Sequence, residues 1–280
     1  MSRPRVSILT PSFNQAEWLA ENLRSVALQT YADIEHVVMD GGSTDGSVEL
    51  LEEAEGITWR SEPDNGQADA INKAFALSTG DIIGWINSDD AYVDGRVVAD
   101  IVAFFEKHPG VDVAYGHCLQ TAADGAVIQV LWAPRFDARL LGIVDFISQP
   151  AVFIRRRVLA EPMLDESFHF TLDYELWLRL ASRGAVFARI PRILAVDRHQ
   201  PERKSLTMLD IHAADSKRLS AMYGAAPAPT RFYLRQRVCG ALLIPSIPAQ
   251  LALSAPTDPL AGLWRRQLFS RKSTWPEEYR

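Results

Sequence analysis

The sequence predicts an α/β fold, in which a mostly parallel sheet is flanked by helices on both faces. Residues 5–116 alternate short apolar runs with segments of helical hydrophobic spacing, a pattern typical of repeated β-α-β units. Each apolar run ends in polar or turn-forming residues, as a strand does when it leads into a crossover helix. From about residue 120 the pattern is less regular, which indicates a mixed second half of the sheet.

The first half of the chain is expected to hold five strands, with a helix after each of the first four. Ser43 or Thr44 is placed to cap the second helix, and Gly80 to close the third. The expected strands cover residues 5–12, 34–40, 56–62, 81–88 and 112–118, and the expected helices cover residues 16–30, 45–55, 65–80 and 95–110.

The second half contains one clear amphipathic helix, at residues 171–184. Leu172, Leu176, Trp177 and Leu180 share one apolar stripe, and Gly184 is placed to end the helix. Helices are expected beyond residue 204, with a Pro-rich break at residues 227–229. Strands are expected within residues 126–132, 149–159, 185–190 and 193–199.

Composition narrows the functional classes. The 280 residues are 48% hydrophobic, which is ample for a sizeable core, and the net charge of −6 without any Lys/Arg block argues against a nucleic-acid partner. Cys118 and Cys239 form neither a zinc spacing nor a disulfide framework, and the N-terminal apolar run is too short for a signal peptide. We therefore expect a cytoplasmic protein. The sequence contains no uninterrupted apolar stretch of about 18 residues, so no membrane-spanning helix is expected.

Polar residues follow each of the first four predicted strands. They form the segments Thr10–Asn14, Asp40–Ser43 and Glu62–Asn65 and the pair Asp89-Asp90. Ligands of parallel sheets sit at the carboxyl ends of the strands. We therefore expect these four strand ends to converge on one crevice.

The pair Asp89-Asp90 follows a strand that reads as buried, and no cation stands beside it in the sequence. Mg²⁺ and Mn²⁺ are typically held by one or two carboxylates together with phosphate oxygens. Because successive strand residues point to opposite faces, one carboxylate can bind the ion while the other holds a ribose or a water. The alternative is that the pair caps the next helix, for which Asp94 is better placed.

Three segments occur in a fixed order: VSILTPSFNQAEWLAENLRSVALQTYADIEHVVMDGGSTDGS, SEPDNGQADAINKAFALSTGDIIGWINSDD and DYELWLRL. Together the three segments resemble the family 2 glycosyltransferases of the GT-A fold, over roughly residues 5–200. The resemblance implies inverting transfer of a sugar from a nucleotide-sugar to an acceptor hydroxyl, with Mn²⁺ or Mg²⁺ as cofactor. It also implies a GT-A domain at residues 1–204, and residues 205–280 are expected to form a helical C-terminal extension.

Within this domain, the resemblance implies a Rossmann-like nucleotide half at about residues 1–118 and an acceptor half at about residues 119–204. It places Asp90 on the metal and Asp89 near the ribose, although Asn87 stands where the family's Asp-x-Asp motif has its first acid. His199 is either a third metal ligand or a diphosphate contact, with a solvent-exposed histidine as the alternative.

The resemblance also implies a nucleotide pocket. Thr10, Pro11 and Asn14 would grip base and ribose, and Asp40 would accept the N3 proton of uracil unless it caps its own loop. Glu17 is either a ligand or a favourable charge at a helix N-terminus.

Two further residues of this pocket have ordinary alternatives. Asp64 would line the base, with helix capping as the alternative. Lys73 would meet the diphosphate, unless it only pairs with Asp69 on the helix surface. Gln149 falls in a segment that would line the acceptor side.

The general base is expected to be Asp173, in the first turn of the helix at residues 171–184. Helix N-termini face the crevice in this architecture, and the helix dipole favours the ionised carboxylate. Leu172-Asp173 stands where the family has Glu-Asp, so the first acid is absent. The alternative for Asp173 is that it only places a favourable negative charge at the helix N-terminus. Glu175 is the alternative base.

Two rival functions share parts of this pattern. A sugar nucleotidyltransferase should carry a Gly-rich basic loop after the first strand, but TPSFNQAEW has neither Gly nor a basic residue. A non-catalytic nucleotide-binding protein is the other alternative.

Residues 229–270 mix Arg with apolar residues, so they either contact a membrane surface that carries a lipid-linked acceptor or form a packed subdomain or dimer contact. The donor sugar, the choice between a saccharide and a lipid-linked acceptor, and the oligomeric state stay open.

Overall fold

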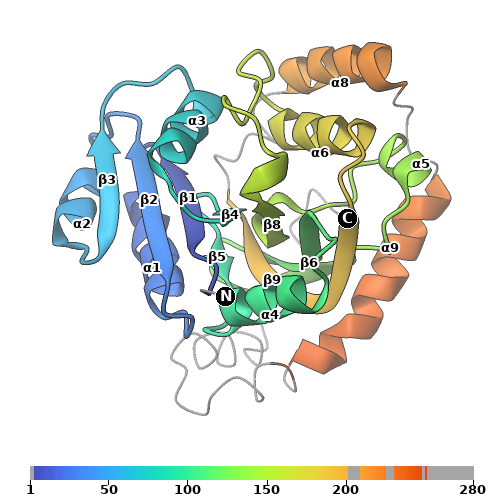
Figure 1. The fold of residues 1–280 in the computed structure, drawn as a ribbon, viewed down its shortest axis with the longest axis horizontal. Helices are drawn as coiled ribbons and strands as arrows, with labels where there is room; N and C mark the ends of the chain where they lie inside the picture. The colour runs from blue at the N-terminus through green and yellow to red at the C-terminus, as the bar shows by residue number, and fades with distance from the viewer. Residues whose placement is uncertain (1–2, 201–208, 225–229, 248–249, 251–280) are drawn as a thin grey trace.

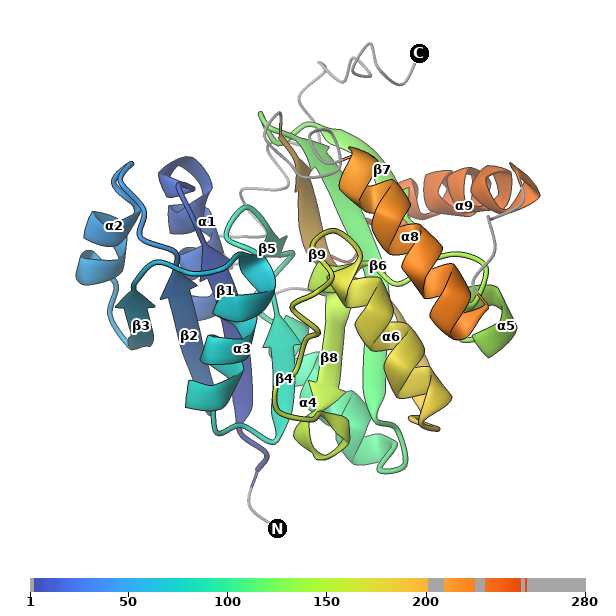
Figure 2. The same ribbon diagram turned by 90° about the horizontal axis from the view of Figure 1, so that it is seen from above.

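The computed structural model describes residues 3–200, 209–224, 230–247 and 250. Its first half alternates strands and helices as the sequence predicts. Helices α1 and α3 cover opposite faces of the strands between them (Figures 1 and 2). The elements are β1 (Val6–Ser12), α1 (Ala16–Ala27), β2 (Ile34–Asp40), α2 (Ser47–Glu53), β3 (Ile57–Ser61), α3 (Gln67–Leu77) and β4 (Ile82–Trp85).

The second half contains shorter strands and the remaining helices. Short 3₁₀ turns cover Gln149–Ala151, Arg156–Val158 and Ile244–Ser246. The elements are β5 (Ala91–Tyr92), α4 (Val97–Lys107), β6 (Val113–Ala122), β7 (Val127–Leu131), α5 (Ala138–Leu141), β8 (Val152–Arg155), α6 (Leu172–Ser182), β9 (Phe187–His199), α8 (Leu209–Tyr223) and α9 (Thr230–Leu243).

One mixed sheet runs through the described chain, in the order β3-β2-β1-β4-β8-β6-β9-β5, with β7 paired to β6. Strands β1 to β4 pair in parallel, whereas β8 is antiparallel to both of its neighbours, β4 and β6. The predicted fold, with a mostly parallel nucleotide half and a mixed acceptor half, is confirmed. The domain boundary near residue 204 stays a prediction.

The prediction of two separate strands at residues 185–190 and 193–199 is wrong, because β9 is one continuous strand. Pro191, which lacks an N–H donor, suggested a break. The partner strand β6 instead shifts its register on both sides of His117, so pairing continues past the proline. Gly116 permits this close approach, since an added Cβ would lie 2.6 Å from the side chain of Leu194.

The predicted cap of the second helix is also wrong. Helix α2 begins after Gly46, whose φ of 100° suits only a residue without a Cβ, and no side chain caps it. The Ser43 hydroxyl donates to Asp40 instead. Gly184 does follow α6 as predicted, with a φ of 83°.

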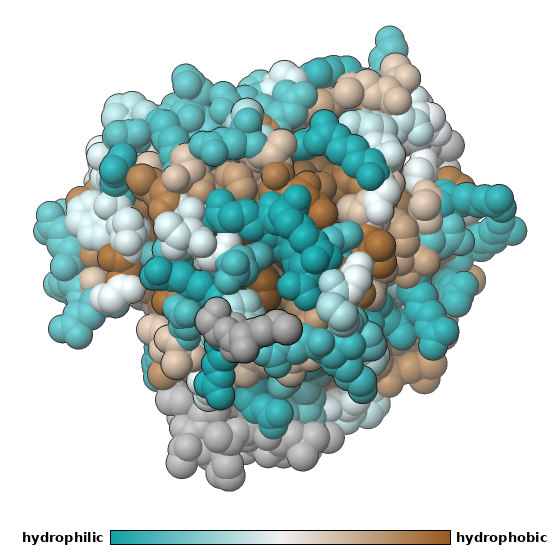
Figure 3. All heavy atoms as spheres, viewed as in Figure 1, coloured by the Kyte–Doolittle hydropathy of each residue, from teal (hydrophilic) through white to brown (hydrophobic). Residues whose placement is uncertain are grey.

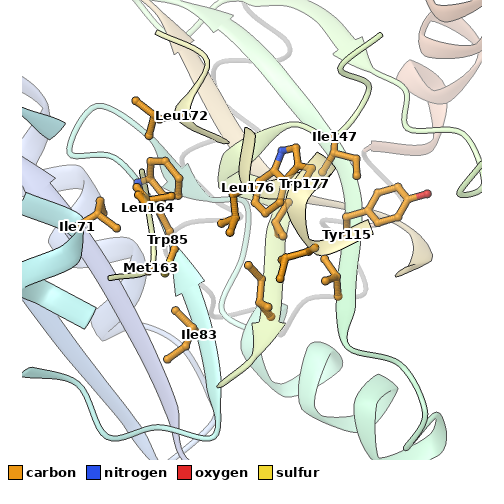
Figure 4. Packing of buried hydrophobic residues seen from close by; sticks show 14 of the residues in the cluster. Ile71, Ile83, Trp85, Tyr115, Ile147, Met163, Leu164, Leu172, Leu176 and Trp177 are labelled. Carbon is orange, nitrogen blue, oxygen red and sulfur yellow. The ribbon is translucent and has the colours of Figure 1, made fainter. Parts of the chain in front are cut away.

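The core confirms the predicted apolar stripe of α6. Leu172, Leu176, Trp177 and Leu180 are all at most 4% exposed and pack toward the sheet (Figure 4). Burial of one such side chain contributes roughly 1.5–3 kcal/mol, so the stripe fixes α6 against the acceptor half of the sheet. Within the described residues, no helix is long and apolar enough to cross a membrane.

Histidine burial predicts a pH dependence of stability. His36 on β2 is 4% exposed, and loss of hydration lowers its pKa to about 3 from the usual 6.5. Below pH 6.5 the unfolded chain therefore binds a proton that the folded chain does not. We expect the free energy of unfolding to fall by about 1.4 kcal/mol per pH unit from this group as the pH is lowered from its unfolded toward its folded pKa.

Urea titrations between pH 7 and pH 5 test this expectation. The variant His36→Gln keeps a side chain that can hydrogen-bond the Thr10 hydroxyl, which lies 3.0 Å from His36 Nε2, and should flatten the dependence. The same change at the exposed His108 should leave the curve unaltered. Equal pH slopes for the wild type and His36→Gln would contradict the account.

Candidate active site

A cleft of about 1390 Å³ lies at the carboxyl ends of β1 and β4 and beside the N-terminus of α6. Its wall includes the loop after β1, the segment before α3, the acidic pair after β4, and residues of α8. Three of the four polar strand ends predicted to converge do line this cleft. The cluster after β2, at residues 40–43, does not.

The predicted site residues divide into two groups. Those that line the cleft are Pro11, Asn14, Asp64, Asp89, Asp90, Gln149 and Asp173. Those that lie outside its lining are Thr10, Glu17, Asp40, Lys73 and His199.

Asp40, at the end of β2, is 1% exposed, and its own loop occupies its carboxylate. Oδ2 accepts hydrogen bonds from the backbone N–H of Gly42 at 3.1 Å and of Ser43 at 2.8 Å, and from the Ser61 hydroxyl at 2.7 Å. Oδ1 accepts from the Ser43 hydroxyl at 2.5 Å. These contacts favour the alternative in which Asp40 caps its own loop.

Three other residues outside the lining are Thr10, which is bound within the protein, and Lys73 and Glu17, which match their ordinary alternatives. The Thr10 hydroxyl is buried against His36. Lys73 pairs with Asp69 at 3.3 Å and with Glu62 at 3.0 Å. Glu17 is exposed in the first turn of α1, where its charge suits the helix dipole.

The end of the cleft where the nucleobase is expected is built by the loop after β1 and the segment before α3. Asn14 adopts a left-handed φ of 51°, and its Oδ1 accepts the N–H of Thr44 at 2.9 Å. Asp64 packs directly against Gly41, since a Cβ added to Gly41 would lie only 2.8 Å from Asp64 Oδ2. Phe13 lines the same region and is 58% exposed.

Asp90 lines the cleft and is 5% exposed. Its Oδ1 accepts the backbone N–H of Arg198 at 3.2 Å, and its Oδ2 accepts Asn87 Nδ2 at 3.3 Å. Asp89 accepts a side-chain N–H of Gln200 at 3.3 Å. The tail of β9 thus meets the acidic pair, which the sequence separates from it by more than a hundred residues.

Asn87 connects the acidic pair to the acceptor side. Its Oδ1 accepts N–H groups of Trp85 at 2.9 Å and of Gln67 at 2.7 Å. Because the indole N–H can only donate, the amide must point its NH₂ group toward Asp90 and toward Gln149 Oε1, 2.9 Å away. An aspartate here could not donate either bond, which gives a physical reason for Asn at this departure from the family motif.

The donor set fits a divalent ion that is held jointly with phosphate oxygens. Among the described residues, no group of three or more His, Cys, Asp or Glu side chains could hold a metal alone. Asp90 and Asp89 nevertheless present hard carboxylate oxygens to the cleft, and Mg²⁺ commonly takes only one or two from the protein. His199 is 7% exposed rather than solvent-exposed, one residue beyond the Arg198 N–H that contacts Asp90.

At the other end of the cleft, Asp173 lies in the first turn of α6, and Asp145 faces the same space from the loop after α5. The Asp145 side chain is exposed where it faces the cleft. Partial loss of its hydration and the charge of the nearby Asp173 carboxylate raise the pKa of Asp145. Asp173 lies in the first turn of α6, where the helix N-terminus favours a negative charge, whereas Asp145 lies on a loop, so Asp173 stays the candidate base.

Glu175, the alternative base, is 2% exposed and already bound. It accepts two hydrogen bonds from Arg179 Nε, at 3.0 and 3.1 Å, and one from the Tyr223 hydroxyl at 2.9 Å. These contacts leave it outside the cleft lining and favour Asp173.

Sequence reasoning missed Phe13, Asp145 and Arg198. Phe13 carried a signal, as an aromatic residue within a turn where no core is expected. Asp145 carried no signal in the sequence, because it lies far from Asp173 along the chain and only the fold brings the two residues together. Arg198 pairs with Glu21 at 2.8 Å and lies 4.7 Å above the Trp18 ring, so it ties the end of β9 to α1.

Comparison with known proteins agrees with this geometry. The model of the family described as "Glycosyl transferase family 2" matches residues 7–172. A PGL/p-HBAD biosynthesis glycosyltransferase of Mycobacterium bovis (strain BCG / Pasteur 1173P2) is 26% identical over 216 residues, which cover 75% of this chain and 82% of the relative.

Two solved structures share the fold. The mannosyltransferase PcManGT from Pyrobaculum calidifontis, in complex with GDP-Man and Mn²⁺, matches with a TM-score of 0.62 and 21% identity, covering 95% of this chain and 80% of that chain. S. aureus TarS 1–349, in complex with UDP-GlcNAc, matches with a TM-score of 0.60 and 17% identity. That match covers 78% of this chain but only 66% of the TarS chain, just under two thirds of its length. At these identities the matches support the GT-A fold.

Proposed function

The chain belongs to glycosyl transferase family 2, and from this premise we propose that it moves a sugar from a UDP-linked donor to an acceptor hydroxyl, with inversion at the anomeric carbon. The observation that carries the proposal is the shared cleft, in which the pair Asp89-Asp90 and the helix-borne Asp173 line one space. A diphosphate needs charge compensation at one end, and an acceptor hydroxyl needs a base at the other.

In the proposed reaction, Asp173 takes the proton of the acceptor hydroxyl while the hydroxyl oxygen forms a bond to the anomeric carbon. The bond from that carbon to the diphosphate oxygen breaks, and the diphosphate leaves with the electron pair. Asp90, with Asp89 beside it, would hold Mn²⁺ or Mg²⁺. Such an ion, when bound, neutralises charge on the leaving diphosphate. No covalent enzyme intermediate is needed for a single inversion.

We propose that the nucleobase of the donor binds beside Phe13, and that this nucleobase is the uracil of a UDP-linked sugar. Phe13 offers an exposed ring for stacking, and Asp64 and Asn65 offer polar atoms beside it. The similar structures contain UDP-GlcNAc in one case and GDP-Man in the other, so a GDP-linked donor is the alternative, as is a dTDP-linked one. We propose Asp89 as the ribose contact and Gln149 as an acceptor-side residue.

A thermal-shift panel of UDP-, GDP- and dTDP-sugars with Mn²⁺ tests this proposal, followed by donor hydrolysis with the compounds that bind. The expected result is stabilisation by a UDP-sugar and release of UDP. Binding without release, for every donor and with acceptors supplied, would favour the non-catalytic alternative. Release of pyrophosphate from a nucleoside triphosphate and a sugar phosphate would favour a nucleotidyltransferase.

Helix α9 supports a lipid-linked acceptor. Its side chains Leu234, Val238 and Leu242 are 65%, 53% and 74% exposed and form a stripe at i, i+4 and i+8, while the opposite face packs on β7. The helix carries three Arg and no acidic residue. Figure 3 shows hydrophobic and hydrophilic residues intermixed where Figure 1 places α9. Tyr233 on this helix also lines the cleft.

We therefore expect the cytoplasmic enzyme to bind the inner membrane face through α9. Residues 229, 248–249 and 251–270 of the predicted contact lie outside the described residues. Wild-type protein should float with vesicles that contain phosphatidylglycerol, and Leu234→Asp combined with Leu242→Asp should stay in the dense fraction. Asp substitution of the exposed Val186, far from α9 in sequence, is the matched control. Equal flotation of all three proteins would remove the membrane role.

A further inference from the structure

Helix α8, which lies outside the region matched by the family, covers the segment that leads into α6. Figures 1 and 2 both show α8 running beside α6. The segment at residues 165–171 ends at Thr171, the residue before α6, and Asp173 follows in the first helical turn. Contacts between α8 and this segment therefore act directly on the position of the proposed base.

The central contact is a carboxylate that binds three consecutive backbone amides. Asp215 on α8 is 4% exposed, and its Oδ2 accepts the N–H groups of His169 at 3.1 Å, Phe170 at 2.8 Å and Thr171 at 3.2 Å. These three amides belong to the residues directly before Leu172, the first residue of α6, and no side chain of the Thr171 cap bonds the helix. Asp215 thus fixes the backbone that enters α6 from a distant part of the chain.

Other side chains of α8 hold the same segment on either side of these amides. Arg218 donates to the Ser167 carbonyl at 2.8 Å and to its hydroxyl at 3.0 Å, and its guanidinium lies 4.1 Å above the Phe168 ring. Tyr223 donates to Glu175, two residues beyond Asp173. The segment is therefore restrained both before and after the proposed base.

We propose that Asp215 is a positioning residue, which holds the N-terminus of α6 so that the Asp173 carboxylate faces the acceptor hydroxyl. This inference rests on the proposed function, in which Asp173 is the base. A base must lie within hydrogen-bond reach of the proton that it takes, and a displacement of about 1 Å can lower a rate by about 10²-fold. Asp215 itself touches neither substrate nor reacting atoms.

The experiment uses the full chain with four substitutions and two readouts. Asp215→Ala removes the acceptor of the three amides, whereas Asp215→Asn keeps one oxygen that can accept them. Asp210→Ala removes an exposed carboxylate from the same helix and is the matched control. Asp173→Asn reports on the base itself. The readouts are amide hydrogen exchange of the peptide containing residues 169–171, and nucleotide release, with water as acceptor, from the donor selected by the panel.

For Asp215→Ala, we expect faster exchange at residues 169–171 and a kcat lowered by about 10²-fold, with the donor KM unchanged. Asp215→Asn should recover most of the kcat and the amide protection, and Asp210→Ala should match the wild type. This split between kcat and KM, with rescue by Asn, is not expected of a residue that only stabilises the fold. If Asp215→Ala does not fold, Asp215→Glu keeps the charge, shifts the contact by one methylene and should lower kcat by about 10-fold.

Three outcomes overturn the inference and are distinguishable from one another. Wild-type kcat in folded Asp215→Ala or Asp215→Glu, together with an inactive Asp173→Asn, would remove the role of Asp215 and leave the proposed function intact. Full activity in Asp173→Asn would instead remove the base assignment, and the role of Asp215 with it. Unchanged exchange at residues 169–171 in Asp215→Ala would show that this carboxylate does not hold the segment.

Discussion

Replacing Asp173 with Asn is expected to lower kcat by about 10²–10⁴-fold and to leave donor binding intact, because it removes the proton acceptor but hardly changes the size of the side chain. Asp173 lines the cleft, and its neighbour Glu175 is bound to Arg179 and Tyr223 and cannot replace it without losing those contacts. Initial rates of transfer or donor hydrolysis, with donor affinity measured separately by calorimetry, give both quantities.

Asp145→Asn is the informative comparison for this prediction. Asp145 faces the same space from a loop and lacks the helix N-terminus that favours a negative charge at Asp173, so its replacement should cost less than that of Asp173. The opposite ranking, with Asp145→Asn inactive and Asp173→Asn active, would transfer the role of base to Asp145. Asp210→Asn, at an exposed position on α8 outside the cleft lining, controls for the loss of one carboxylate.

The second large effect is expected at Asp90. Asp90→Asn should abolish the stabilisation that Mn²⁺ adds to the nucleotide complex and lower turnover by about 10²–10³-fold, because loss of a metal's charge stabilisation costs several kcal/mol. Thermal unfolding with UDP, with and without Mn²⁺, measures the first quantity. Removal of divalent ions from the wild type with EDTA should reproduce the loss, and added Mn²⁺ or Mg²⁺ should restore activity.

Asp89→Asn separates metal binding from nucleotide binding. With Asp89 near the ribose, this variant should bind UDP more weakly and still respond to Mn²⁺. A full metal response in Asp90→Asn, or none in Asp89→Asn, would exchange the two roles. Asp89→Asn keeps one oxygen for Gln200, and Asp90→Asn keeps one for the Arg198 N–H but sets its NH₂ group against that of Asn87. Thermal unfolding of each variant without ligand therefore serves as the control for folding.

The fold of the first half was predictable from sequence because its determinants are local. The strand that ends at Asp40 is a short apolar run of 7 residues, and the helix that begins at Gln67 shows helical spacing over 11 residues. The order of such elements then leaves few topologies. The continuous strand β9 was not predictable, because Pro191 is tolerated only through a register shift in a distant partner, β6.

The site was predictable only in part, for the same reason. The pair Asp89-Asp90 and Asp173 could be found because strand ends and helix N-termini face a common crevice. By contrast, the four hydrogen bonds that occupy Asp40 arise from a loop conformation and from Ser61 on another strand. The role of Asp215 depends on where α8 packs, and no local pattern in the sequence reports that.

The central claim is that the acidic pair after β4 and the diphosphate of the donor share a divalent ion. A crystal structure of the protein with UDP and Mn²⁺, with data collected for the anomalous signal of manganese, tests it most directly. The account predicts one anomalous peak in contact with the Asp90 carboxylate and with diphosphate oxygens. UDP bound in the cleft with no manganese at Asp90, or with the ion held elsewhere, would contradict it.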